Sequence, residues 1–498
     1  MVNDELEVST TPVTRLKAAA RRLVSYWDEA RLRVAQAKSA SVRQAPGAIP
    51  WRAALEDILK VGYGIQGQSR FVDGSWERIR WRTTPSAGAL YPYDVMACVV
   101  GEGCYLWDID RGRLLRCGLE PMRGEDLASA GLATAPGNRL EALLVLVARP
   151  WLSMKKYSLR GYAYCHLDVG HAATNLAIYT KALGYTPTLH LRFSRSPVSS
   201  HLRLDGLCRE PLAILSFAGA GIAAEPESGM DVEIGGLEPP EEPEILNWMS
   251  LQGLLSLDSP LEPPSVPAAT TLLREPEGVD EELLVPLPAG RPQPAAAGEW
   301  HSAVLGRRSA KGFYDKPLTI EQIGALLCVL RDEGLPADCP PDGSARLGAR
   351  LIARNVEDLA GVFAYAPRSH ALHRIDGRAD DFRPACMQQP IAANAAALLI
   401  FHAPVRRLFE ERGYSGFTEL LFRAAELGQR LHLAAARLGA LGMTCVGGFD
   451  GEESAALARL AGEEEVAYVI LLGIPNDAAF KHDRLKVAYS HGQTTLEE

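Results

Sequence analysis

Residues 307–311, Arg-Arg-Ser-Ala-Lys, place three cationic side chains and one hydroxyl group within five positions. Such groups hold a phosphate dianion, because guanidinium and ammonium groups form charge-assisted hydrogen bonds with its oxygen atoms. The cluster precedes Thr319-x-x-Gln322, a capping-box pattern that predicts a helix over residues 323–330. The sequence therefore predicts a phosphate clamp ahead of a helix. The clamp residues are Arg307, Arg308, Ser309 and Lys311.

Three further motifs contain residue types that suit a binding or catalytic site. Residues 85–92 read Pro-Ser-Ala-Gly-Ala-Leu-Tyr-Pro, and Lys156-Tyr157 follows later in the same half of the chain. In the second half, the two glycines of Val446-Gly447-Gly448-Phe449 let a backbone approach a flat ligand closely. Asp168 and His171 are interpreted as structural residues at the start of a helix, where an acidic side chain serves as a cap.

Length and composition bound the class of protein. A chain of 498 residues predicts two domains, and its formal charge of -9 with no run of Lys and Arg argues against nucleic-acid binding. No signal sequence is recognisable, and the most apolar stretches are shorter than the roughly 18 residues of a membrane span. We therefore expect a cytoplasmic protein with no membrane partner. The nine cysteines never form Cys-x-x-Cys, so neither a metal site nor a disulfide framework is predicted.

The chain divides into four segments by composition. Residues 1–45 are a charged, helical N-terminal segment, and residues 46–224 form a first domain. Residues 225–296 are rich in proline and are predicted to be a connector running over the surface. Residues 297–498 form a second domain.

The second domain repeats features of the first. Residues 167–171 align with 425–429 at an offset of 258, and both following helices then end on Ala-Leu-Gly, with Gly184 and Gly442 as predicted caps. The pattern indicates an internal duplication. Strands are predicted at 105–107 and 143–147 in the first domain and at 362–365 and 398–401 in the second. The string Gly62-x-Gly64-x-x-Gly67 follows a helix-like segment, so a dinucleotide-binding βαβ unit is rejected.

The clamp and its helix resemble the opening of a nitroreductase-fold flavoprotein. Residues 85–92, with Arg82 before them and Lys156-Tyr157 after, resemble the SagB-type branch of that superfamily, the FMN-dependent azoline dehydrogenases of peptide natural-product pathways. The resemblance covers roughly residues 45–220 and 297–490. It implies an α+β fold class: two nitroreductase-like domains, each a mainly antiparallel sheet flanked by helices, form an intrachain pseudo-dimer.

The resemblance further implies that FMN lies between the two units. One unit supplies the clamp with Gly447 and Gly448, and the other supplies the turn of Pro85, Ser86, Ala87 and Gly88 with the catalytic residues Lys156 and Tyr157. Each motif is altered in the opposite half. In the first half, Leu189-His190 occupies the place of the two glycines. In the second half, residues 341–344 occupy the place of the Pro-Ser turn, and Gly413-Tyr414 occupies that of the Lys-Tyr pair. We therefore expect one composite site and one FMN per chain.

The implied reaction oxidises thiazoline or oxazoline to thiazole or oxazole. The flavin accepts a hydride and passes electrons to oxygen, while the protein positions the ring and removes a proton. Lys156 is the expected base, since desolvation lowers an amine pKa, and Tyr157 relays or orients. Lys481 and Arg484 are weaker candidates for a further phosphate contact, and Gln388-Gln389 for the flavin edge.

Two other functions stay open at the level of sequence. One is a nitro- or quinone reductase fed by NAD(P)H. The other is a flavin-free scaffold subunit of a peptide-modification complex. For the leading hypothesis, the expected partners are a peptide or carrier-bound small-molecule substrate and a cyclodehydratase or assembly-line enzyme. Thiazoline, oxazoline and a similar saturated bond are all compatible with the motifs.

Overall fold

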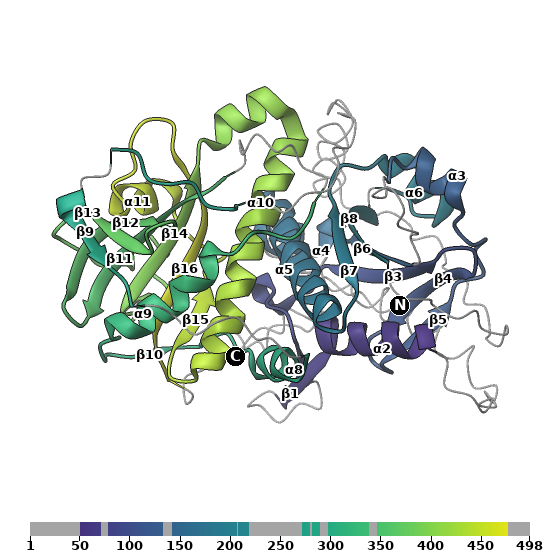
Figure 1. Ribbon diagram of the computed structural model, residues 1–498, viewed down its shortest axis with the longest axis horizontal. Helices are drawn as coiled ribbons and strands as arrows, with labels where there is room; N and C mark the ends of the chain where they lie inside the picture. Colours follow the sequence, from purple (N-terminus) through teal and green to yellow (C-terminus); the bar gives the residue numbers. More distant parts are fainter. Residues whose placement is uncertain are drawn as a thin grey trace, which may run out of the picture.

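Two β-sheets lie on either side of a central pair of helices in the computed structural model (Figure 1). The structure describes residues 50–70, 78–132, 142–206, 208–218, 271–278, 281–288, 297–337 and 346–476. The predicted N-terminal segment, most of the connector, residues 341–344, Lys481 and Arg484 lie outside these ranges.

The first sheet has the strand order β5-β4-β3-β6-β8-β7, with all neighbours antiparallel. Its central strand β6 (Ala142–Ala148) is buried throughout because it is apolar at every position. A separate hairpin joins β1 (Ile65–Arg70) to β2 (Arg78–Arg82). The other strands are β3 (Tyr93–Val99), β4 (Gly103–Asp108), β5 (Arg113–Arg116), β7 (Thr186–His190) and β8 (Glu210–Ala218).

The second sheet contains the same order of strands. It runs β10-β16-β14-β11-β12-β13-β9, and β15 also pairs with β16, so β13-β12-β11-β14-β16-β15 repeats the order of the first sheet. The α+β fold class is confirmed, and so are the predicted strands in both sheets. The strands are β9 (Leu284–Pro286), β10 (Phe313–Tyr314), β11 (Gly348–Val356), β12 (Leu359–Ala366), β13 (Ala371–Asp376), β14 (Ala397–Ala403), β15 (Gly442–Cys445) and β16 (Glu465–Pro475).

Helices cover the sheets and form the seam between them. The longer helices are α2 (Pro50–Tyr63), α5 (Arg160–Ala182), α8 (Ala297–Gly306) and α10 (Val405–Leu438). Shorter helices are α3 (Gly124–Ser129), α4 (Pro150–Tyr157), α6 (Arg195–His201), α9 (Ile320–Leu327) and α11 (Gly451–Leu457). The 3-10 turns are η1 (Ala87–Ala89), η2 (Glu281–Leu283), η3 (Cys328–Arg331) and η4 (Pro390–Ala392). The predicted capping box at the start of α9 is present, with Thr319 and Gln322 bonded reciprocally.

Helices α5 and α10 pack side by side at the centre of the molecule (Figure 1). Their close approach depends on Gly170, where an added Cβ atom would lie 2.7 Å from the Cβ atom of Ala425. His171 Nδ1 lies 3.0 Å from Gln429 Oε1. These two residues are equivalent at the offset of 258, so equivalent positions of the two halves meet at the seam, as in a two-fold dimer.

The sequence placed two helix boundaries wrongly. Asp168 and His171 lie in the middle of α5 rather than at its start, because the helix begins at Arg160, after a kink at Ser158 with φ of 53°. Gly184 follows the end of α5 with φ of 93°, as predicted, but α10 ends earlier than Gly442. Its cap is Gly439, where φ of 71° ends the helix before the Ala-Leu-Gly run is complete.

The two halves exchange structural elements at the seam. Ala303 and Val304 of α8 belong to the hydrophobic core beneath the first sheet. In the opposite direction, Tyr164 and Leu167 of α5 belong to the core beneath the second sheet. Each core therefore needs residues from the other half of the chain.

Candidate active site

The Pro-Ser turn and the Lys-Tyr pair lie against each other. Gly88 has φ of +64°, and a Cβ atom added there would lie 2.6 Å from both Lys156 Nζ and Tyr157 Oη. The pair occupies the last turn of α4, and Lys156 Nζ is 5.1 Å from the centroid of the Tyr157 ring. A glycine is therefore required at position 88 for its backbone conformation and to leave room for both functional side chains.

A buried carboxylate fixes the shape of this turn. Asp168 accepts a hydrogen bond of 2.5 Å from Ser86 Oγ and one of 3.1 Å from the backbone N–H of Ala87. Ser86 Oγ in turn accepts the backbone N–H of Tyr91 at 2.8 Å. Burial raises the pKa of Asp168 to about 7, against the opposing effect of the two donors. The Ser86 hydroxyl is thus engaged within the turn, and Asp168 is the anchor that the sequence prediction assigned to helix capping.

The glycines of the second half lie beside the turn of the first half. A Cβ atom added to Gly447 would lie 3.8 Å from Ala87 Cβ and 3.9 Å from the ring of Tyr164. Tyr164 Oη donates a hydrogen bond to the carbonyl of Gly447. Two motifs separated by about 360 positions therefore border the same space.

The loop that contains these glycines is held from both sides. Gln389 Nε2 donates to the carbonyl of Gly448 at 2.6 Å, and Arg160 Nη1 donates to that of Phe449 at 2.8 Å. Met387 and Gln388, just before Gln389, both have positive φ values, of 49° and 56°. Gln389, one of the two glutamines that the sequence suggested for the flavin edge, fixes the backbone at Gly448.

Arg307 joins the two halves. Its guanidinium is buried and donates from Nε to the carbonyl of Thr83 at 2.7 Å and from Nη2 to that of Arg82 at 3.2 Å. Burial lowers the pKa of Arg307 to about 10. Arg307 therefore positions the clamp against the segment that leads into the Pro-Ser turn.

The other clamp residues are more accessible. Arg308 is exposed, and its Nη1 donates to the carbonyls of Leu305 and Arg307 at 2.9 Å. Ser309 is half-buried, and Lys311 Nζ lies 4.5 Å from the ring centroid of Trp81 on β2. Arg308, Ser309 and Lys311 are thus the residues that can contact an anion. The position of Lys311 beside β2 again pairs the second half with the first.

Comparison with known proteins identifies the family. The model of the nitroreductase family matches residues 304–474. A Methanocaldococcus jannaschii protein named as a nitroreductase, MJ1384, is 30% identical over 167 residues, which cover 32% of this chain and 76% of that protein. The chain belongs to the nitroreductase family. It is accordingly an oxidoreductase of a flavin-dependent family.

A solved structure shares the whole nitroreductase architecture. A crystal structure of a protein from Anabaena variabilis, described as a nitroreductase, has a TM-score of 0.68 at 22% identity and covers 85% of this chain and 88% of its own. Because the matched region is 85% of the present chain, it must extend over both halves, and the shared fold therefore includes both sheets. A second crystal structure, of a protein from Ralstonia eutropha, covers 42% of this chain and 99% of that protein's chain, at 21% identity and a TM-score of 0.30.

Strand pairing identifies the residues that correspond to the two glycines in the opposite half. Leu189 pairs with Leu215, which pairs with Leu144, the third residue of β6. In the same way, Cys445 pairs with Ile470, which pairs with Leu399, the third residue of β14. Leu189 therefore corresponds to Cys445. The counterparts of Gly447 and Gly448 are Leu191 and Arg192, two positions beyond the Leu189-His190 expected from the sequence offset.

Charged side chains fill the space at this mirror-related position. Arg192 is buried and its Nη2 lies 3.6 Å from Glu419 Oε2, which also accepts a hydrogen bond of 2.6 Å from Arg412. Arg192 thus stands where the other half has Gly448, and its large side chain lies in an ion-pair network.

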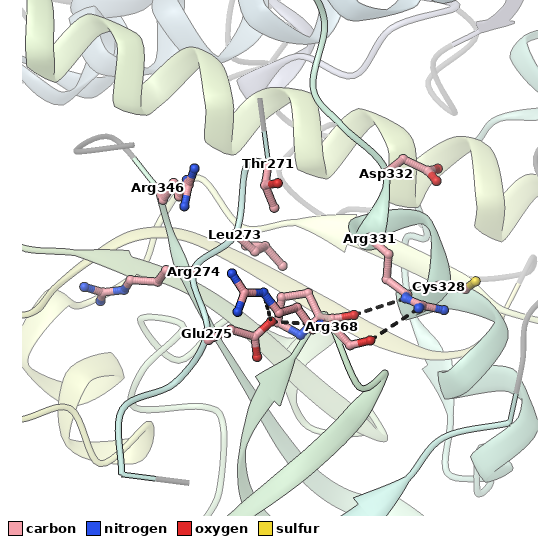
Figure 2. Close-up of a pocket in the computed structure, with 10 residues that line it drawn as sticks. Thr271, Leu273, Arg274, Glu275, Cys328, Arg331, Asp332, Arg346 and Arg368 are labelled. Atoms are coloured by element: carbon pink, nitrogen blue, oxygen red, sulfur yellow. Dashed lines mark hydrogen bonds and ion pairs between the residues drawn. The ribbon is translucent and has the colours of Figure 1, made fainter. Parts of the chain in front are cut away.

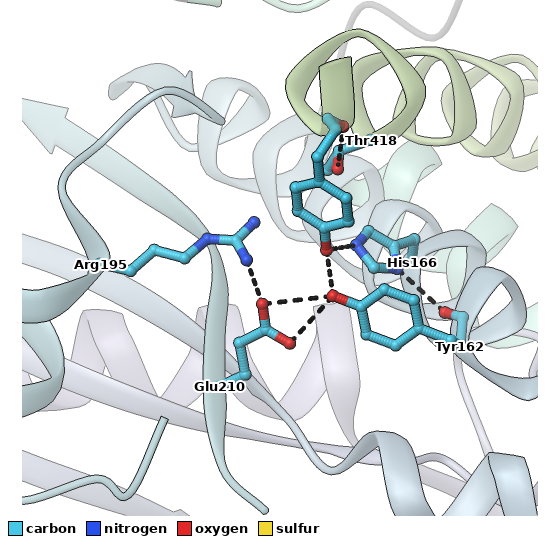
Figure 3. A network of polar contacts seen from close by, with 6 residues as sticks. Tyr162, His166, Arg195, Glu210 and Thr418 are labelled. Atoms are coloured by element: carbon cyan, nitrogen blue, oxygen red, sulfur yellow. Dashed lines mark hydrogen bonds and ion pairs between the residues drawn. The ribbon is translucent and has the colours of Figure 1, made fainter. Parts of the chain in front are cut away.

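A neighbouring network includes Tyr162, His166 and Glu210 (Figure 3). Tyr414, which the sequence comparison assigned to the counterpart of the Lys-Tyr pair, belongs to the same network. Its hydroxyl group lies 2.8 Å from His166 Nε2 and is bonded to Tyr162 Oη. Tyr162 donates to Glu210, which also pairs with Arg195. Burial raises the pKa of both tyrosines and lowers that of His166 to about 3. The Tyr414 hydroxyl group is therefore engaged in hydrogen bonds within the protein.

Two residues of the site were not predicted from the sequence, and a third, Asp168, was assigned a different role. Trp81 and Tyr164 carry no motif, and each reaches the second half only through the folding of the seam. The Asp168 side chain was singled out by its motif, yet its bonds to Ser86 and Ala87 span more than 80 positions. No local spacing could have indicated them.

The residues present fit a flavin. Arg308, Ser309 and Lys311 offer two cations and a hydroxyl to a phosphate, and Gly447 leaves backbone uncovered beside the turn of residues 85–88. Within the described ranges, no cluster of His, Cys, Asp and Glu could hold a metal ion, and no helix is long and apolar enough to cross a membrane.

Proposed function

We propose that the chain is an FMN-dependent oxidoreductase that dehydrogenates azoline rings, or a similar saturated bond, in a peptide natural-product intermediate. The observation that carries the proposal is the contact of Lys156 and Tyr157 with Gly88, in a turn that itself borders Gly447 of the other half. An amine and a phenol thereby meet where the flavin-binding motifs of both halves meet. A family member acting only as a reductase has no need of a base at that position.

Each residue group has a separate role in this proposal. Arg308, Ser309 and Lys311 would hold the FMN phosphate, and Gly447 and Gly448 would approach the ring system with their backbone. The bound flavin supplies the redox chemistry. Lys156 takes a proton from the substrate ring carbon, and the Tyr157 hydroxyl orients or relays it.

The neighbourhood of Tyr157 supports this assignment. Its ring meets that of Tyr164 edge to face, with centroids 5.0 Å apart. Tyr164 is fixed by its bond to the carbonyl of Gly447. The phenol therefore packs against a ring that is itself fixed, which favours a positioned hydroxyl group over a mobile surface tyrosine.

The filled mirror-related position supports one FMN per chain. Arg192 with Glu419 occupies the counterpart of Gly448, and Tyr414 is bonded within the protein. A flavin-free scaffold would not be expected to keep every intact motif within one composite site.

A comparison of electron donors tests the proposal. We expect a synthetic peptide containing one thiazoline ring to drive oxygen consumption and to lose two hydrogen atoms, measured by mass spectrometry. NADPH alone should leave the flavin absorbance unchanged under anaerobic conditions. Rapid bleaching by NADPH without peptide oxidation would favour the nitro- or quinone-reductase alternative, which the family membership keeps as the second candidate. A cyclodehydratase is the partner that would supply the ring.

A further inference from the structure

A second candidate site lies on the surface of the second half. It is a cavity of about 550 Å³, and it shares no lining residue with the flavin site (Figure 2). Four arginines line it, Arg274, Arg331, Arg346 and Arg368, together with the carboxylates Glu275 and Asp332. Guanidinium groups are suited to planar, paired recognition of carboxylates.

One wall of this pocket is part of the predicted connector. Residues 271–275 are fixed to the domain by bridges from Thr271 to Glu333 and from Leu273 to Leu347. The Arg274 N–H donates to the carbonyl of Leu347 at 3.0 Å, so the wall is held by backbone hydrogen bonds. The connector therefore contributes a defined surface in addition to linking the two halves.

The positive charge of the pocket is only partly neutralised. Arg331 donates to the carbonyls of Pro367 and Arg368 at 3.0 and 3.4 Å, which orients its guanidinium but adds no negative charge. Arg346 makes no hydrogen bond or ion pair with any described residue, and its Nε atom is buried. Arg274 pairs with Glu464 at 2.5 Å.

The net charge of the pocket lining is opposite in sign to that of the whole protein. Four arginines against Glu275 and Asp332 leave the lining with a net charge of +2, or of +1 when Glu464 is included, whereas the chain has a formal charge of -9. Arg368 is largely exposed, and its Nε atom lies 3.9 Å from Glu275 Oε1. Arg368 can therefore exchange Glu275 for another carboxylate at a low cost in free energy.

We propose that this pocket binds an acidic segment of a peptide or protein partner. Spaced carboxylates can pair with Arg346 and Arg331 while avoiding Glu275 and Asp332. A compact polyanion would meet both acidic groups together with the arginines, which disfavours it. The binding is independent of the flavin, so its failure would leave the proposed function standing.

Fluorescence anisotropy with the full chain tests the proposal. The probe is a labelled peptide with glutamate at alternate positions, and the matched peptide has glutamine there. We expect binding of the glutamate peptide only, weakened about tenfold or more by Arg346→Gln, since a charge-assisted hydrogen bond is worth roughly 1.5–3 kcal/mol. The control Arg378→Gln, an exposed arginine outside the pocket, should bind normally. Equal binding of both peptides, or no effect of Arg346→Gln, would overturn the proposal.

Cys328 provides an independent readout. It lines the pocket as a half-buried free thiol. The glutamate peptide should slow its alkylation by iodoacetamide, and the glutamine peptide should not. Inorganic phosphate is the competing probe: if phosphate alone protects Cys328 and the peptide does not, the pocket is a small-anion site and the peptide proposal fails.

Discussion

Replacing Gly88 by alanine should separate activity from stability. The added Cβ atom would lie 2.6 Å from Lys156 Nζ and from Tyr157 Oη. Ordinary contacts are about 3.5–4.0 Å, so both groups must retreat by roughly 1 Å. These are the ends of side chains, and the move itself costs little. The remaining cost is the left-handed backbone at φ of +64°, roughly 1–2 kcal/mol for a residue other than glycine.

Catalysis should suffer far more than folding. A displacement of about 1 Å in a positioning group lowers a rate by about 100-fold. The matched control is Gly112→Ala, because Gly112 has φ of +60° and nothing within 4 Å of an added Cβ atom. Both variants should lose similar stability in urea denaturation and keep their flavin, while only Gly88→Ala loses oxidation of the thiazoline peptide. Equal turnover in the two variants would refute the placement of Lys156 and Tyr157.

Further substitutions test the other parts of the site. Lys156→Ala should keep the yellow colour and stop peptide oxidation; retained turnover would remove Lys156 from the catalytic role. Because burial raises the folded-state pKa of Asp168 to about 7, the stability that it contributes is full below its unfolded pKa near 4 and falls as pH rises toward about 7, by about 4 kcal/mol. Asp168→Asn should flatten this fall in urea denaturation, and an equally steep fall in the variant would contradict the assignment. Glu210→Gln should cost about 3–5 kcal/mol, since it leaves Arg195 without its buried partner, yet leave the flavin content unchanged. A changed flavin content there would argue against a structural role for the mirror-related network.

The strands and the helix cap that depend on neighbouring residues could be predicted from the sequence. The continuous apolar runs of β6 and β14 and the Thr319 capping box are present because burial and capping act over a few residues. The offset of 258 also predicted that His171 and Gln429 are equivalent, and they face each other at the seam.

Long-range contacts account for what the sequence could not show. Arg307 reads as a phosphate ligand, but its guanidinium bonds to two carbonyls 224 and 225 positions away. Asp168 reads as a helix cap, but a kink at Ser158 starts the helix earlier and turns the carboxylate toward residues 86 and 87. Such partners depend on how the two halves dock, which no spacing along the chain records.

The flavin content of the purified protein tests the central claim most directly. Extraction after denaturation should release one FMN per chain, and the double variant Arg308→Ala, Lys311→Ala should release none. Two FMN molecules per chain would show that the mirror-related position is also a working site. A colourless protein that stays colourless with added FMN would contradict the composite site altogether.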